Sequence, residues 1–117
     1  MARSHIRLMA GTLGDGGSDI FTVTVGRKVL LSSMMLSSET PVVTCDVELY
    51  LTPDGGSELL IMKATIASND DSGRNPWPDS QPWITLYSGD AIRLHNATPT
   101  GGPNLNYVLS GIEYDPG

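Results

Sequence analysis

The chain is poor in cations, cysteine and aromatic side chains. Its 117 residues include seven Lys and Arg against thirteen Asp and Glu, so the formal net charge is −6. Proteins that bind the phosphate backbone of nucleic acids need a basic stripe, which this composition does not supply. An anionic membrane surface would repel the same net charge. We therefore expect neither nucleic acid nor a membrane as a partner.

Cysteine occurs once, as Cys45. A single thiol forms no internal disulfide, which is compatible with a reducing compartment. Residues 1–7 carry charge, but no apolar run long enough for a signal peptide follows them, and no segment could span a bilayer. We expect a chain that is made and folded in the cytosol. The triplet Asn96-Ala97-Thr98 matches the N-glycosylation pattern, which has no meaning in such a chain.

The side chains used in catalysis and metal binding are also few. The two histidines, His5 and His95, and the thiol of Cys45 are scattered, whereas a zinc site needs at least three ligands at suitable spacing. No Gly-x-Ser-x-Gly motif accompanies a serine. Cys45 falls on the apolar side of an alternating segment, where a thiol packs as a small hydrophobe. We predict that the protein is not an enzyme and has no catalytic residue, cofactor or metal ion.

One acidic segment leaves calcium open. Asn69, Asp70, Asp71 and Asp79 could offer oxygen ligands to this ion. Their spacing does not match the Asp-x-Asp-x-Asp-Gly calcium loop, and acidic loop residues are usually only solvated. The sequence does not decide whether the segment around Asp70 and Asp71 binds calcium.

What the chain does contain is a regular alternation of apolar and polar residues. Residues 43–51 place Val47 and Leu49 on one side and Asp46 and Glu48 on the other, the pattern of a half-buried strand. Similar short segments, separated by Gly-rich and Pro-rich turns, are typical of β-sandwiches. The expected strands are 6–13, 20–25, 29–36, 43–51, 59–66, 83–87, 91–95 and 105–114.

This pattern predicts an all-β fold, a single antiparallel β-sandwich or jelly roll of about eight short strands. Residues 1–117 form one domain, because no linker, repeat or helix of ordinary length interrupts the pattern. The turn at 53–56, Pro-Asp-Gly-Gly, has strong turn chemistry, in which glycine supplies a positive φ. Residues 29–36 are more uniformly apolar, so this strand could be covered on both faces.

Two segments are expected to make contacts with partners. Residues 1–7 could form an extended N-terminal arm that adds a strand to a neighbour's sheet. This arm carries Arg3, His5 and Arg7.

The second segment is residues 68–82, which we expect to form a long loop because its prolines prevent regular strand pairing. Trp77 lies between two of these prolines, and Trp83 follows the loop. A rigidly held Trp suits a protein–protein contact. Aromatic rings on a β-sandwich can equally stack on sugar rings, or simply cover the edge of the core.

The order of several short segments carries a family resemblance. The chain resembles small β-sandwich virion proteins of tailed bacteriophages, which decorate or cement capsids or occur as tail accessories. The segments that carry this resemblance are, in order, 10–13 (AGTL), 21–25 (FTVTV), 26–28 (GRK), 29–36, 43–51, 88–90 (SGD) and 109–113 (LSGIE).

The resemblance implies a capsid decoration, or cement, protein that binds the assembled shell and stabilises it by bridging subunits. Its partners would be the major capsid protein and copies of itself, as a homotrimer. The chain would be made in the cytoplasm of the bacterial host and located in the virion. Two alternatives remain: a tail, collar or baseplate component with the same fold, and a carbohydrate-binding module that uses Trp77 and Trp83.

Overall fold

The computed structural model describes residues 2–14, 16–38, 45–66, 84–98 and 103–115. Eight strands run through these residues, and no helix occurs among them. No described segment is therefore a helix that could cross a membrane. The strands are β1 (Ala2–Leu13), β2 (Ser18–Thr22), β3 (Lys28–Ser38), β4 (Cys45–Thr52), β5 (Leu59–Ile66), β6 (Ile84–Leu86), β7 (Ala91–Asn96) and β8 (Leu105–Asp115).

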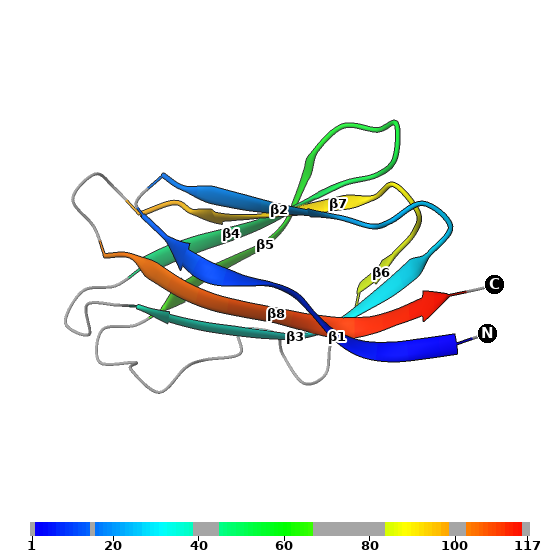
Figure 1. Cartoon of the computed structure of the whole chain (residues 1–117). Coiled ribbons are helices and arrows are strands. Elements are labelled where there is room, and N and C mark those ends of the chain that lie inside the picture. Colours follow the sequence, from blue (N-terminus) through cyan, green and yellow to red (C-terminus); the bar gives the residue numbers. More distant parts are fainter. Residues whose placement is uncertain (1, 15, 39–44, 67–83, 99–102, 116–117) are drawn as a thin grey trace.

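The strands form two antiparallel sheets that face each other, so the predicted β-sandwich is confirmed (Figure 1). Sheet A has the order β1-β8-β3-β6, and sheet B has the order β2-β7-β4-β5. The first and last strands of the chain are thus neighbours, with β8 in the interior of sheet A between β1 and β3. Both ends of the described chain lie at the same end of the sandwich (Figure 1).

The core lies between the sheets and follows from the alternation in sequence. In β4, Cys45, Val47 and Leu49 are buried while Asp46 is exposed, as the period of two predicts. The other strands contribute their inward side chains in the same way. The fully buried side chains of largest volume are Met34, Leu36, Leu49, Ile66, Leu86, Ile92, Leu94, Leu105, Leu109, Val23, Val29 and Val47.

The predicted turn at 53–56 closes the hairpin of β4 and β5. Gly55 has φ of 75°, a left-handed conformation that glycine adopts without steric cost. The amide of Gly56 donates to the carbonyl oxygen of Pro53 at 2.8 Å. The expected turn chemistry is therefore present in the structure.

The prediction that strand 29–36 is covered on both faces is wrong. Strand β3 has one buried face, with Val29, Leu31 and Leu36 inside, whereas Met35 on the other face is 40% exposed. The reason is that β3 belongs to a sheet with only one other layer against it. Its outward residues meet no further layer among the residues that the structure describes.

Residues 2–7 are the first half of β1 and not a separate arm. They pair with β8 from Ala2 opposite Asp115 to Arg7 opposite Ser110, which corrects the expectation of an extended segment. No described strand pairs with the other edge of β1. A β-bulge between Arg7 and Met9 interrupts this edge, and exposed arginines line it, both of which discourage strand addition by a neighbour.

The predicted loop 68–82 lies outside the described residues. Trp77, Trp83 and the candidate calcium ligands Asp70 and Asp71 are outside them as well. The structure therefore gives no position for these side chains.

A polar contact joins the two sheets near one end of the core. The buried hydroxyl of Tyr107, on β8, donates to Oδ2 of Asp19, on β2. Burial and this hydrogen bond raise the pKa of Tyr107 well above its ordinary value, so the phenol stays protonated and remains a donor. The contact therefore ties sheet A to sheet B through a neutral donor and a carboxylate.

Candidate functional site

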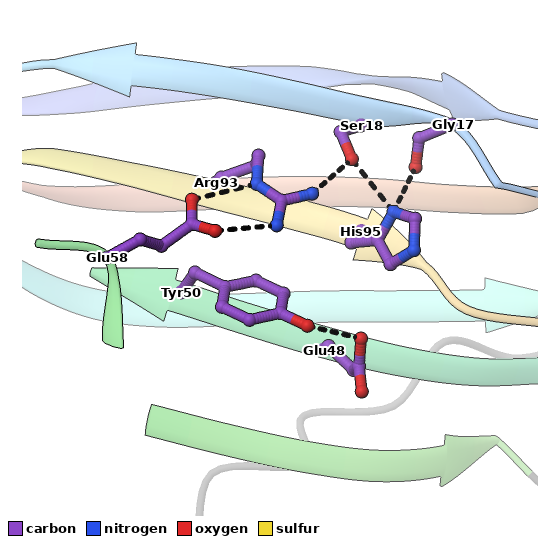
Figure 2. Close-up of polar contacts among 7 residues, drawn as sticks. All are labelled: Gly17, Ser18, Glu48, Tyr50, Glu58, Arg93 and His95. Atoms are coloured by element: carbon purple, nitrogen blue, oxygen red, sulfur yellow. Dashed lines mark hydrogen bonds and ion pairs between the residues drawn. The ribbon is translucent and has the colours of Figure 1, made fainter. Parts of the chain in front are cut away.

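The outer face of sheet B carries a network centred on Arg93, in β7 (Figure 2). Its guanidinium donates to both oxygens of Glu58, from Nε at 2.9 Å and from Nη2 at 2.8 Å. Nη1 donates to Oγ of Ser18, in β2, at 2.8 Å. The guanidinium also lies over the ring of Tyr50, 4.3 Å from the centroid. Arg93 thus links β7 to three other segments. It forms a bidentate ion pair with Glu58 before β5, a hydrogen bond with Ser18 in β2 and a cation–π contact with Tyr50 in β4.

This network changes the acidity of its members. The hydrogen bonds from Arg93 hold the pKa of Glu58 below the ordinary value for a glutamic acid; partial desolvation opposes them, and the positive charge of Arg93 adds to the lowering. Tyr50 donates its phenolic hydrogen to Oε1 of Glu48 at 2.6 Å. That hydrogen bond raises the pKa of Tyr50. Glu58 is therefore ionised at neutral pH, and the phenol of Tyr50 is protonated.

His95 lies at the end of the same network. Its Nδ1 is 2.8 Å from Oγ of Ser18 and 3.2 Å from the carbonyl oxygen of Gly17. A carbonyl oxygen can only accept a hydrogen bond, so Nδ1 must carry a proton to donate to the carbonyl oxygen of Gly17. No carboxylate contacts the imidazole in the described part of the chain, and Ser18 already accepts from Arg93. Among the described residues, the Ser18–His95 pair therefore lacks the carboxylate that would complete a nucleophilic triad. Its hydrogen bonds fix the turn at Gly17.

An open pocket of about 390 Å³ adjoins this network between β4 and β5. Its polar side chains are mostly engaged with each other: Oγ1 of Thr65 donates to Oδ1 of Asp46 at 3.0 Å, and Nζ of Lys63 lies 4.0 Å from Oε2 of Glu48. Among the described residues, no three His, Cys, Asp or Glu side chains gather closely enough to hold a metal ion. The lining residues are Asp46, Val47, Glu48, Lys63, Ala64, Thr65 and Ala97.

The ion pair of Glu58 predicts a pH dependence of stability. Because the pKa of Glu58 is depressed in the folded state, its stabilising effect is present above the unfolded-state pKa and is lost as the pH falls through the folded-state pKa. We expect Glu58→Gln to melt a few degrees below the wild type at neutral pH, since exposed ion pairs stabilise little. The difference should disappear at a pH far below the ordinary pKa of a glutamic acid, where Glu58 is protonated in both states.

Thermal melts at the two pH values, followed by circular dichroism, measure this effect. The control is Glu58→Gln in an Arg93→Gln background, where the substitution should have no effect at either pH. An equal difference between wild type and Glu58→Gln at neutral and acid pH would mean that the shape of the side chain, and not its charge, carries the stabilisation.

The outer face of sheet A has a different character. The strand register places its outward side chains in five rows across β1, β8 and β3. Three rows at one end contain cations or His5, the fourth is apolar, and the fifth is polar. The rows are Arg3–Tyr114–Lys28, His5–Ile112–Leu30, Arg7–Ser110–Ser33, Ala10–Val108–Met35 and Thr12–Asn106–Ser37.

The sequence-predicted contact residues Arg3, His5 and Arg7 thus lie together, exposed, on one face of β1. Nζ of Lys28 lies 5.1 Å from the centroid of the Tyr114 ring, at the same end of the face. In the apolar row, the side chains of Met35 and Val108 are 40% and 38% exposed. They border a hollow of about 160 Å³ whose lining also includes Ser37 and Asn106 together with Gly11, Leu36 and Tyr107 beneath.

Comparisons with known proteins establish the fold alone. No family model matches the chain, and no curated protein matches it. The solved NLP core of Drosophila is 16% identical, covers 92% of this chain over 98% of its own, and superposes with a TM-score of 0.54. The CBM36-1 domain of a multidomain xylanase from the hindgut metagenome of Trinervitermes trinervoides is 11% identical, covers 95% of this chain over 96% of its own, and gives a TM-score of 0.52.

Sequence reasoning missed most of the outer-face residues. Arg93 and Glu58 are 35 positions apart, and nothing in either segment signals their pairing. Met35 lies in the uniformly apolar segment 29–36, which could have been covered on both faces, so its exposure had no signal in the sequence. Val108 could have been found, because it alternates with Tyr107 and Leu109 and so falls on the outward side of β8.

Proposed function

We propose that this chain is a bacteriophage virion structural protein, a capsid decoration protein that binds the assembled shell and stabilises it by bridging subunits. The order of short segments that resembles such proteins leads to the proposal. The observation that supports it is the outer face of sheet A, where Met35 and Val108 expose apolar surface in the middle of a broad sheet. Exposed apolar patches rimmed by polar groups are typical of protein-binding surfaces.

The edges of the sheets are less suited to binding than the faces. Strand β6 has three residues and β2 has five, and β1 and β5 each contain a bulge. Short, bulged or charged edge strands resist pairing with another chain. We therefore assign the contacts with the major capsid protein and with further copies of this chain to side-chain surfaces, and the trimer remains part of the proposal.

The NLP core of Drosophila supports the general idea of assembly and nothing more specific. Its structure was described in connection with pentamer formation and histone binding. A sandwich of closely similar extent can thus form a closed oligomer. For this acidic chain we propose the capsid as the partner and no histone, because the resemblance in sequence concerns virion proteins.

The test is the copy number of the chain in purified virions of the phage that encodes it, measured by quantitative mass spectrometry against the major shell protein. We expect hundreds of copies in a fixed ratio to the shell. A few copies per particle would assign the chain to the tail, collar or baseplate. Absence from the particle would contradict every virion role and would direct the next experiment to glycan binding, with Trp77→Ala and Trp83→Ala as variants.

A further inference from the structure

The outer face of sheet A concentrates positive charge on an acidic protein. Three of the seven Lys and Arg residues lie there, as Arg3, Arg7 and Lys28. The rows of this face contain no carboxylate. Elsewhere, each described cation pairs with a carboxylate, and these pairs are Arg27–Glu113, Lys63–Glu48 and Arg93–Glu58.

Arg3 and Arg7 differ from these paired cations because no carboxylate contacts either of them within the described residues. Arg3 and Arg7 are also fully on the exposed side of β1. A protein with net charge −6 could have paired them internally, and here it leaves them open to solvent. The unpaired charge is therefore complementary to an acidic surface outside this chain.

Next to the charged rows lies the apolar hollow of about 160 Å³ beside Met35 and Val108. Its volume exceeds that of a methyl group or a water molecule, so it can accept part of an apolar side chain. Leu30 and Ile112, half-buried in the second row, form a separate apolar strip between the rows that contain Arg3 and Arg7. An apolar centre with charge beside it is the usual arrangement of a protein-binding surface.

The face has the size of an interface but does not complement itself. Five rows spaced by about 7 Å on three strands about 4.8 Å apart cover about 500 Å² in projection. Specific interfaces bury at least about 600 Å² of accessible surface per partner. The accessible surface of this face is larger than its projected area because its side chains protrude, so the face is large enough for such an interface. Two copies packed through this face would bring cations against cations or against Thr12, Ser37 and Asn106, and no carboxylate would meet Arg3 or Arg7.

We propose that the outer face of sheet A docks on an acidic protein surface, with carboxylates opposite Arg3 and Arg7 and an apolar side chain in the hollow beside Met35 and Val108. The inference rests on the proposed function, because the acidic surface would belong to the shell protein. Nucleic acid fits this face less well. Only three Lys or Arg residues are present, against about six to ten phosphate contacts in proteins that depend on them, and the net charge repels phosphates.

The experiment uses shells of the phage grown without this gene and measures how tightly the purified full chain rebinds to them. The variant Arg3→Gln/Arg7→Gln should bind about tenfold more weakly, and its binding should depend less on salt than that of the wild type. Met35→Ser should weaken binding at all salt concentrations. The matched control is Lys63→Glu, which changes the net charge by the same amount on the outer face of sheet B and should bind as the wild type does.

The outcomes separate this inference from the proposed function. Wild-type rebinding that is unaffected by Arg3→Gln/Arg7→Gln and by Met35→Ser would overturn the docking face and leave the decoration role intact. A wild-type chain that does not rebind to shells would overturn both. Binding of the wild type to duplex DNA, abolished in Arg3→Gln/Arg7→Gln, would overturn the assignment to a protein partner. Melting temperatures equal to that of the wild type show that the variants are folded.

Discussion

Replacing Gly111 by alanine is expected to lower the melting temperature by about 10 °C or more. A Cβ atom at this position would lie 2.4 Å from the carbonyl oxygen of Leu30 and 3.2 Å from its carbonyl carbon. Both are backbone atoms of the neighbouring strand β3, so the clash is not relieved by rotating a side chain. Overpacking of this kind costs about 3 kcal/mol when the backbone itself has to move.

The position of Gly111 explains why the structure would not adjust easily. It lies in β8, which is paired on both sides, opposite Ile6 of β1 and Leu31 of β3. Both neighbouring strands have a β-bulge close to this position. The bulge in β1 follows Arg7, which is opposite Ser110, and the bulge in β3 follows Leu31, which is opposite Gly111. Moving β8 away from β3 would disturb hydrogen bonds in the centre of sheet A.

Thermal unfolding of Gly111→Ala beside Gly14→Ala checks this prediction. Gly14 is exposed, and the nearest atom to a Cβ there is Oδ1 of Asn104 at 3.7 Å, an ordinary contact. Gly14→Ala should leave the melting temperature nearly unchanged or raise it slightly, because alanine reduces the entropy of the unfolded chain. If Gly111→Ala melts within a degree or two of the wild type, β3 and β8 pack less closely than the structure indicates.

The fold could be predicted because its strands repeat a local signal. In β4, apolar and polar residues alternate, which predicts the strand and its buried face. A turn with glycine at the position of positive φ follows, which predicts the hairpin. The pairing of the first strand with the last carries no such signal. Residues 2–7 were therefore interpreted as an arm, although β8 pairs with them.

Burial on one face or on both could not be decided from β3 alone. Leu30 and Met35 are as apolar as Leu31 and Leu36, and they are outward residues only because no further layer of described residues lies over them. The same holds for the candidate site. Arg3, His5 and Arg7 are two residues apart and so share a face of any extended segment, but Lys28 and Met35 join them only through the register of β8 and β3.

Replacing Asn96 by alanine is expected to destabilise the protein by about 3 kcal/mol or more. Asn96, at the end of β7, is fully buried. Its Nδ2 donates to the carbonyl oxygens of Leu13 at 3.0 Å and Pro103 at 3.1 Å. Its Oδ1 accepts from the amide of Thr98 at 3.1 Å and from the Thr98 hydroxyl at 2.6 Å.

The loss of stability is large because the partners of Asn96 lie in separate segments. Leu13 ends β1, Pro103 precedes β8, and Thr98 follows β7. Alanine would leave two carbonyl oxygens and one amide without partners at a buried site, where each unsatisfied group costs about 1–3 kcal/mol. Cys45 adjoins the same cluster, with Sγ 3.5 Å from Oδ1 of Asn96, and burial raises the pKa of its thiol. Asn96 thus connects the ends of β1, β4 and β7 with the segment before β8.

Urea unfolding of Asn96→Ala and Asn96→Asp, with Asn106→Ala as the control, measures this contribution. Asn96→Asp keeps the shape but replaces both donor hydrogens by an acceptor facing two carbonyl oxygens, so it should be at least as damaging as alanine. Asn106 accepts one hydrogen bond from Thr12 on an exposed face, and its loss should cost less than about 1 kcal/mol. Equal stability of Asn96→Ala and Asn106→Ala would show that water replaces the buried amide, and that this end of the sandwich is open to solvent.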